Sequence, residues 1–144
     1  MSFIFKPMTA DFEWKWVKAL TNVVMCEDSE GIVCYDDDGL MVAACVADTF
    51  SKDACSVHLA IANPLAIRAG LFNQCADYLF GTRERKRLFG QVPASNKKAI
   101  KLNKHLGYTV VATIPNGICE GEDLVVMCLE KENCKYVKNI KEAA

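Results

Sequence analysis

The stretch VPASNKKAIKLNKHLGY, residues 92–108, combines the end of a strand, a capped basic helix and a glycine stop. Ser95 or Asn96 stands where a helix N-cap is expected, since both side chains accept hydrogen bonds from free backbone N–H groups. Small or apolar side chains follow on one helical face: Ala99, Leu102 and Leu106. Gly107 is placed as a C-cap, because glycine adopts the left-handed backbone at a helix end without strain. The stretch therefore predicts a helix that ends at Gly107 and leads Tyr108 into a further strand.

The composition predicts one domain over residues 1–144. Of the 144 residues, 51% are hydrophobic, which is enough for one sizeable core. The formal net charge of -1 argues against a protein that coats nucleic acid generally. No segment resembles a secretory signal or reaches the roughly 20 apolar residues that a membrane span requires. We therefore expect a soluble, cytoplasmic protein without a membrane association.

Basic residues are concentrated between Gly81 and His105, where eight lysines or arginines face the single acid Glu84. They are Arg83, Arg85, Lys86, Arg87, Lys97, Lys98, Lys101 and Lys104. These side chains could contact the phosphates of a ligand or of a nucleic acid, but a solvated helix face and loop explain them as well. Aromatic residues are not interleaved as they are in single-strand binders, so a nucleic-acid partner is not favoured.

The eight cysteines show none of the spacings that are typical of a metal site. There is no CxxC and no Cys/His pair at zinc-ligand spacing. Four of the cysteines lie among Val, Ala, Leu and Met, where a small apolar side chain would serve: Cys34, Cys45, Cys75 and Cys128. Reduced, packed thiols are therefore favoured over a disulfide framework, and we expect no metal ion.

Hydrophobic periodicity predicts the element order β-α-β-β-β-α-β-α-β-β. The expected strands cover residues 3–7, 31–35, 40–50, 55–61, 87–92, 108–115 and 122–131, and the expected helices cover 11–24, 67–80 and 96–106. Asp36 to Gly39 predicts a hairpin turn, and Asn116 to Gly121 a loop. The first helix should bury its apolar residues: Phe12, Trp16, Val17, Leu20, Val23 and Val24. Residues 131–144 carry little apolar content and read as a frayed tail.

This order, together with the stretch from Asn96 to Tyr108, resembles the GCN5-related N-acetyltransferase (GNAT) superfamily. The family's helix and turn place Asn, a small residue, an apolar residue, Gly and an aromatic residue at set spacings. The matching positions here are Asn96, Ala99, Leu102, Gly107 and Tyr108. The resemblance implies an α+β GNAT (acyl-CoA N-acyltransferase) fold, with a mixed, mostly antiparallel sheet flanked by helices. Small, divergent GNAT-like proteins of tailed bacteriophages look most similar.

The resemblance also implies a coenzyme A site at the turn between the strand over 55–61 and the helix that begins near Ile67. In this family the backbone N–H groups of that turn hold the diphosphate at a helix N-terminus. The corresponding residues are Ala66, Ile67, Arg68, Ala69, Gly70 and Leu71, with Asn96 on the neighbouring helix. The sequence departs from the family's pattern here, because Ile67 replaces Gln or Arg and Phe72 replaces the second small residue. Arg68 stands one place late.

The catalytic positions of the family are only partly present. Many GNAT enzymes protonate the departing thiolate with a tyrosine four residues before the helix-ending glycine, and Asn103 holds that place. An amide has no proton to give at a phenol-like pKa. His105 is two positions on, roughly 200° around the helix. The candidates for a general base are His58, whose imidazole suits that work, and the acids Glu120, Glu122 and Asp123. His58 could equally be a histidine at the edge of the core whose ring a neighbour satisfies.

Two hypotheses of function follow from these residues. The first is a GNAT-like acetyltransferase that moves an acetyl group from acetyl-CoA to an unknown amine by direct attack. The alternative is a catalytically inactive GNAT-fold binding or assembly module, for example a phage head or virion accessory protein. A homodimer would be compatible with either hypothesis. If a phage encodes the chain, the expected location is the host cytoplasm or the virion.

Overall fold

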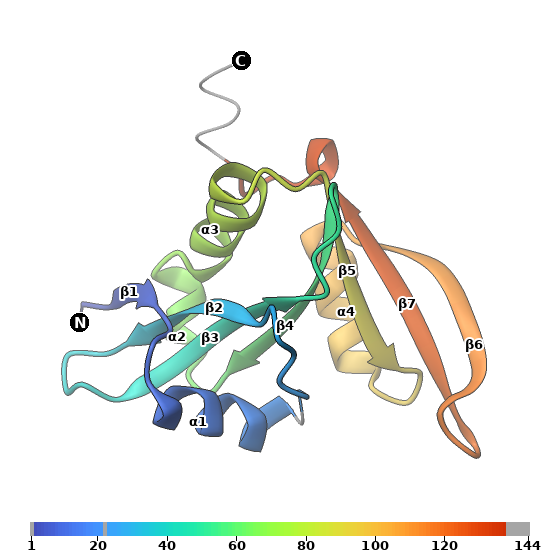
Figure 1. Ribbon diagram of the computed structural model, residues 1–144, viewed down its shortest axis with the longest axis horizontal. Coiled ribbons are helices and arrows are strands. Elements are labelled where there is room, and N and C mark those ends of the chain that lie inside the picture. Colours follow the sequence, from blue (N-terminus) through green and yellow to red (C-terminus); the bar gives the residue numbers. More distant parts are fainter. Residues whose placement is uncertain (1, 22, 138–144) are drawn as a thin grey trace.

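The computed structural model describes residues 2–21 and 23–137. Within these residues, seven strands form one sheet in the order β1-β2-β3-β4-β5-β7-β6 (Figure 1). They are β1 (Ile4–Pro7), β2 (Glu30–Tyr35), β3 (Met41–Asp48), β4 (Ala54–Ile61), β5 (Arg87–Pro93), β6 (Thr109–Cys119) and β7 (Glu122–Glu130). Neighbouring strands are antiparallel except for β4 and β5, which run parallel. This is the predicted mixed, mostly antiparallel sheet of an α+β fold.

Helices cover both faces of this sheet (Figure 1). Helix α1 (Asp11–Thr21) packs on one face, where Val17 meets Val33 and Val46 in an apolar cluster. The other face carries α2 (Leu65–Arg68), α3 (Leu71–Ala76) with its π-helical continuation η1 (Asp77–Thr82), and α4 (Lys97–Leu106). A short 3₁₀ segment, η2 (Lys131–Asn133), follows β7. The order of helices and strands agrees with the one predicted from the sequence.

Helix α4 begins and ends where the sequence predicts. The side chain of Asn96 accepts a hydrogen bond of 3.1 Å from the N–H of Ala99, as an N-cap does. Gly107 has a φ of 108°, and its N–H donates to Lys104 O while that of Tyr108 donates to Asn103 O. This pair of bonds is a Schellman motif, which satisfies carbonyl groups at the helix end. The predicted cap residues are confirmed.

The predicted apolar face of the first helix is right for Val17 and Val23, which are buried, but wrong for three other residues. Phe12, Leu20 and Val24 are 60%, 53% and 74% exposed, whereas Glu13 is fully buried. Glu13 is the third residue of α1, and its Oε1 accepts the N–H groups of Thr9 and Ala10 in the manner of a capping box. Its Oε2 also accepts the Tyr35 hydroxyl. The helix is therefore turned so that this carboxylate meets β2.

The predicted helix over 67–80 is broken near its start. Gly70 has a φ of 104°, a left-handed conformation that separates α2 from α3. The second helix therefore begins at Leu71, and its last turn over Asp77–Thr82 is π-helical. Leu71 and Phe72 both enter the core, so Phe72 fills space that a small residue would leave open.

The last hairpin is longer than predicted. Residues 116–119, expected in a loop, belong to β6, and Glu120 and Gly121 form the turn. All 11 residues of β6 are exposed, since the strand lies at the sheet edge and no helix covers it (Figure 1). A frayed tail is also wrong for residues 131–137, because Cys134 and Val137 are buried in the main core. The remainder of that tail, 138–144, lies outside the described residues.

Six cysteines pack as small apolar side chains, including the four that the sequence places in the core. Burial raises the pKa of the Cys55 thiol to about 12, so this thiol is held in its unreactive protonated form. Cys26 and Cys119 are exposed. In the described part of the chain, no helix combines the length and the apolar character that a bilayer span needs.

Candidate active site

The sheet divides between β4 and β5. These parallel strands pair only at Ala54–Arg87, Cys55–Leu88 and Ser56–Phe89, after which their pairing ends. Beyond this point β5 stays with β7, with which it pairs as far as Pro93, while β4 stays with β3 as far as Ile61. The two strands then separate in the direction of their carboxyl ends (Figure 1). We call this region the fork.

An apolar cavity of about 40 Å³ lies at the fork on the side of α3 and α4. Val57 and Leu59 of β4 form one wall, and Leu88 of β5 forms another. The remaining lining comes from α3 and η1, from the end of α4 and the residue before β6, and from β7 and the segment after it: Phe72, Cys75, Ala76, Leu79, Phe80, Leu106, Tyr108, Leu129, Cys134 and Tyr136. Burial raises the pKa of Tyr108, so its hydroxyl keeps its proton.

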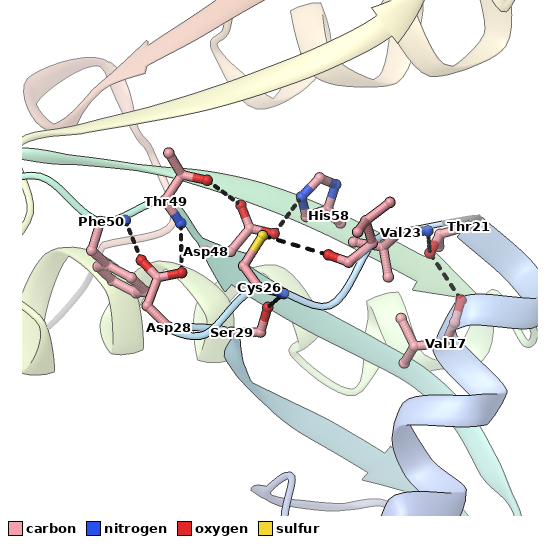
Figure 2. Close-up of polar contacts among 11 residues, drawn as sticks. Val17, Thr21, Val23, Cys26, Asp28, Ser29, Asp48, Thr49, Phe50 and His58 are labelled. Atoms are coloured by element: carbon pink, nitrogen blue, oxygen red, sulfur yellow. Dashed lines mark hydrogen bonds and ion pairs between the residues drawn. The ribbon is translucent and has the colours of Figure 1, made fainter.

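His58 points to the opposite face of the sheet, because successive side chains of a strand alternate. Its Nε2 lies 3.0 Å from Oδ2 of Asp48, the last residue of β3. The other carboxylate oxygen, Oδ1, accepts a hydrogen bond of 3.0 Å from the Thr49 hydroxyl. Figure 2 shows the imidazole and the carboxylate directed toward each other. His58 is therefore satisfied by a neighbour, and the neighbour is a carboxylate that can orient it.

A second carboxylate braces the turn that follows Asp48. Asp28 accepts the N–H groups of Thr49 and Phe50 at 3.1 and 2.8 Å (Figure 2). The bond from Phe50, followed by that from Thr49, lowers the pKa of Asp28, so this side chain is negatively charged at neutral pH. Thr49 has a φ of 52°, which is uncommon outside glycine. Two carboxylates, those of Asp28 and Asp48, therefore lie at the turn that follows β3.

The turn proposed for the diphosphate is more closed than the family pattern implies. The N–H groups of Ala66, Ile67, Ala69 and Gly70 donate to backbone carbonyls within the turn, namely those of Asn63, Pro64, Leu65 and Ile67. Ala66 is buried, while Ile67 and Arg68 are exposed. The short helix α2 has thus used donors that a phosphate-binding loop would present. Arg68 supplies positive charge beside this turn.

Asn103 lies at the fork but is directed into the protein. Its Nδ2 is 3.7 Å from the sulfur of Met127 on β7, and a Cβ built at Gly90 of β5 would lie 3.3 Å from the same nitrogen. His105 is exposed on the other side of α4. Asn96 uses its side-chain oxygen for the helix cap and has its amide group free to donate elsewhere.

The acids considered as alternative bases lie at the other end of the last hairpin. Glu122 accepts the N–H of Ser95, and Asp123 accepts that of Asn116, so both stabilise local backbone. Glu120 lies in the β6–β7 turn. The structure does not bring any of the three into the hydrogen-bond network of His58. The sequence did not single out Asp48 as a site residue. The one feature that could have identified it is its position as a lone acid at the end of an apolar strand.

Much of the basic cluster is paired near the closed end of the fork. Nε of Arg83 lies 2.7 Å from Oε1 of Glu30, and Nε of Arg87 lies 2.8 Å from Oε1 of Glu130. The guanidinium groups of Arg83 and Arg85 also stack on Phe50, at 4.8 and 5.1 Å from its ring centre. These contacts favour a structural role for the arginines. Among the described residues, no three His, Cys, Asp or Glu side chains are grouped as a metal site would require.

Comparison with known proteins gives a clear result for structures alone. No family model matches the sequence, and no curated protein matches it. The chain is similar to the crystal structure of spermidine/spermine N-acetyltransferase SpeG from Vibrio cholerae with manganese ions. That similarity has a TM-score of 0.75 and 12% identity, and it covers 99% of this chain and 98% of the other.

Further structures of the same enzyme agree. Its complex with CoA and spermine matches with a TM-score of 0.73 and 11% identity, over 92% of this chain and 97% of the other. Mutant forms of the enzyme match with a TM-score of 0.77 and 12% identity, over 99% and 100%. The chain therefore has the GNAT fold, as the stretch from Asn96 to Tyr108 predicted.

Proposed function

We propose that this protein is an N-acetyltransferase that moves the acetyl group of acetyl-CoA to an amine. The observation that carries the proposal is the fork, with an apolar cavity on one face and His58 on the other. Val57, His58 and Leu59 follow directly after Ser56, where the pairing of β4 with β5 ends. A thioester entering from the α3 and α4 side and an amine entering from the α1 side would therefore meet between the strands. The similar fold of acetyltransferases supports this proposal.

The reaction is direct transfer. His58 removes a proton from the ammonium form of the acceptor, which frees the nitrogen lone pair for attack on the thioester carbonyl. The new C–N bond forms, the C–S bond breaks, and the second amine proton leaves as the thiolate departs. Asn103 cannot donate the proton that the thiolate takes up, so water or the acceptor nitrogen supplies it. Turnover should therefore be slow.

The site of acetyl-CoA is proposed to extend from the fork to the turn over residues 66–71. The thioester and pantetheine arm would lie along β4 beyond Ser56, and the diphosphate beside Arg68 and the N-terminus of α3. Ala66, Ile67, Ala69, Gly70 and Leu71 line this part, with Asn96 across the fork. Binding should be weak, because the N–H groups of four of these residues already have acceptors.

The acceptor is proposed to be a cationic amine such as a polyamine. Asp48 contacts His58, and Asp28 adds a second negative charge at the turn that follows Asp48. Charged clefts of one sign concentrate ligands of the opposite sign. A structure of similar fold is a complex with spermine, which is consistent with this choice.

Isothermal titration with acetyl-CoA, followed by a free-thiol assay, tests the function. The acceptor panel is spermidine, spermine, free amino acids and lysine peptides. We expect measurable binding, and thiol release that depends on a polyamine. Arg68→Gln should weaken the binding of acetyl-CoA several-fold. Lys52→Gln is the control and should leave binding unchanged, because Lys52 is an exposed lysine just before the first residue of β4, at the end far from Arg68. Binding without thiol release from any acceptor would favour the inactive binding or assembly module instead.

The protein is further proposed to form a homodimer through β6. This edge strand has no charged side chain from Thr109 to Cys119. Its exposed apolar residues are Val110, Val111, Ile114 and Ile118. The outer edge of β6 is uncharged and has unpaired backbone groups. It therefore fits the same edge of a second copy better than it fits a charged partner. A virion partner would compete for the same edge if a phage encodes the chain.

The eight free thiols fit a reducing compartment, so we propose a cytoplasmic location.

A further inference from the structure

Asp48 is buried at a cost that its place in the sheet does not explain. It is 4% exposed, and among the described residues only Glu13 is a comparably buried charged side chain. A buried carboxylate is costly unless hydrogen bonds satisfy it. Glu13 has a structural task, since it caps α1 and binds Tyr35. In the hydrogen bonds described above, the side chain of Asp48 has two partners, His58 and Thr49. Its carboxylate thus binds the imidazole with one oxygen and the Thr49 hydroxyl with the other.

The β3–β4 ladder fixes the geometry of this pair. Asp48 lies opposite Ser56, and Val46 lies opposite His58, so the two side chains are diagonal neighbours on one face. Both strands continue the ladder past Val46, from Asp48 to Ala43 on β3 and from Ser56 to Ile61 on β4. The pairing of β3 with β4 therefore holds the carboxylate and the imidazole next to each other. This strand pairing does not depend on the hydrogen bond between the two side chains.

Thr49 holds the carboxylate in its orientation. Its hydroxyl donates to Oδ1 of Asp48, which leaves Oδ2 for Nε2 of His58. Its backbone is left-handed, with a φ of 52°, and Asp28 stabilises it by accepting its N–H. A strained conformation of this kind persists only where the surroundings enforce it. Asp28, Thr49 and Asp48 thus form a chain of contacts that ends at the imidazole.

We propose that Asp48 is a positioning residue that makes Nδ1 of His58 the catalytic base. A carboxylate only accepts hydrogen bonds, so Nε2 of the neutral imidazole must carry the hydrogen and Nδ1 must carry the lone pair. Nδ1 takes one proton from the acceptor ammonium, and the positive imidazolium that results is stabilised by Asp48. The proton then passes to solvent after each turnover. The catalytic part of this inference rests on the proposed function.

The tautomer can be measured without any activity. The chain has two histidines, so His105→Gln leaves His58 as the only source of imidazole ¹⁵N signals. His105 is exposed and outside the proposed site. At a pH where the ring is neutral, we expect a single Nε2–H tautomer in His105→Gln. Adding Asp48→Asn should give a mixture, because an amide can donate as well as accept. A parent ring in the Nδ1–H form would overturn the proposal.

Kinetics then test the catalytic part. With acetyl-CoA and the best polyamine, Asp48→Asn should lower kcat about tenfold to a hundredfold and leave KM for acetyl-CoA within about twofold. Thr49→Val keeps the β-branched shape but lacks the hydroxyl, and should lower kcat by a smaller factor. Thermal unfolding identifies any variant that fails to fold. If Asp48→Asn does not fold, the kcat of Thr49→Val decides whether Asp48 has a positioning role. Unchanged kcat in both variants would overturn the role of Asp48. Absence of turnover in the parent would overturn the catalytic assignment together with the proposed function, while leaving the measured tautomer intact.

Discussion

At the scale of single residues, Gly107 is constrained both by its backbone and by its surroundings. Its φ is 108°, and a Cβ there would lie 2.7 Å from the carbonyl oxygen of Asn133 and 3.0 Å from Leu129. Gly121 has a φ of 86° but no atom within 4 Å of such a Cβ. We expect Gly107→Ala to lower the free energy of unfolding by roughly 2–4 kcal/mol, and Gly121→Ala by about 1 kcal/mol. Denaturant unfolding measures both, and equal losses would contradict a rigid contact with η2.

Glu13 should make the stability of the fold depend on pH in the acid range. Burial raises the pKa of its carboxyl, but hydrogen bonds from Tyr35, Ala10 and Thr9, together with the charge of Lys6, bring it below the ordinary 4.5. The folded state therefore favours the carboxylate more than the unfolded chain does. This contribution to the free energy of unfolding is fully present above pH 4.5 and is lost as the pH falls through the lowered pKa.

Glu13→Gln tests this contribution, since glutamine keeps an acceptor oxygen for the helix cap without the charge. Thermal unfolding from about pH 6 to about pH 3 should show a larger fall of Tm for the parent than for the variant. Parallel curves would mean that other carboxylates carry the acid sensitivity.

At the scale of elements, the sequence predicted best what neighbouring residues determine. The ends of α4 follow from the side chain of Asn96 and the backbone freedom of Gly107, and both act within one helical turn. The buried face of α1 was wrong in part because Tyr35, which the fold brings close, binds Glu13 and holds it inside. His58 was predicted as a base, but its partner Asp48 stands ten residues away and meets it only through the β3–β4 hairpin.

The exposed edge of β6 yields a prediction about association. If a second copy pairs with this strand, Ile114→Lys should prevent dimer formation, because a charge would be buried without a partner. Ile4→Lys is the matched control, since Ile4 is 62% exposed on β1 at the opposite sheet edge. Analytical ultracentrifugation over a range of concentrations should show a dimer for the parent and for Ile4→Lys, and a monomer for Ile114→Lys. A monomeric parent would refute pairing through β6.

At the scale of the whole molecule, the fork explains how one sheet could hold two substrates. Strand alternation directs Val57 and Leu59 to the apolar cavity and His58 to the Asp48 carboxylate on the other face. The same architecture leaves a proton donor missing at the end of α4, where the amide nitrogen of Asn103 lies 3.7 Å from the sulfur of Met127. The molecule thus presents a candidate base without the acid that the GNAT resemblance implies.

Restoring an acid at position 103 separates a slow enzyme from an inactive module. Gly90 has no side chain, and the atoms nearest to a Cβ built there belong to the Asn103 amide and the Tyr108 ring, so a ring at position 103 would lie beside β5 and Tyr108. If the thiolate leaves without assistance, Asn103→Tyr should raise kcat about tenfold to a hundredfold, because a positioned general acid contributes on the order of 10² or more. Asn103→Phe supplies the same ring without the hydroxyl, and should not raise kcat. Free-thiol release from acetyl-CoA with spermidine as acceptor measures all three proteins. Equal gains in Tyr and Phe variants would assign the effect to packing, and background release from all three would identify a binding module.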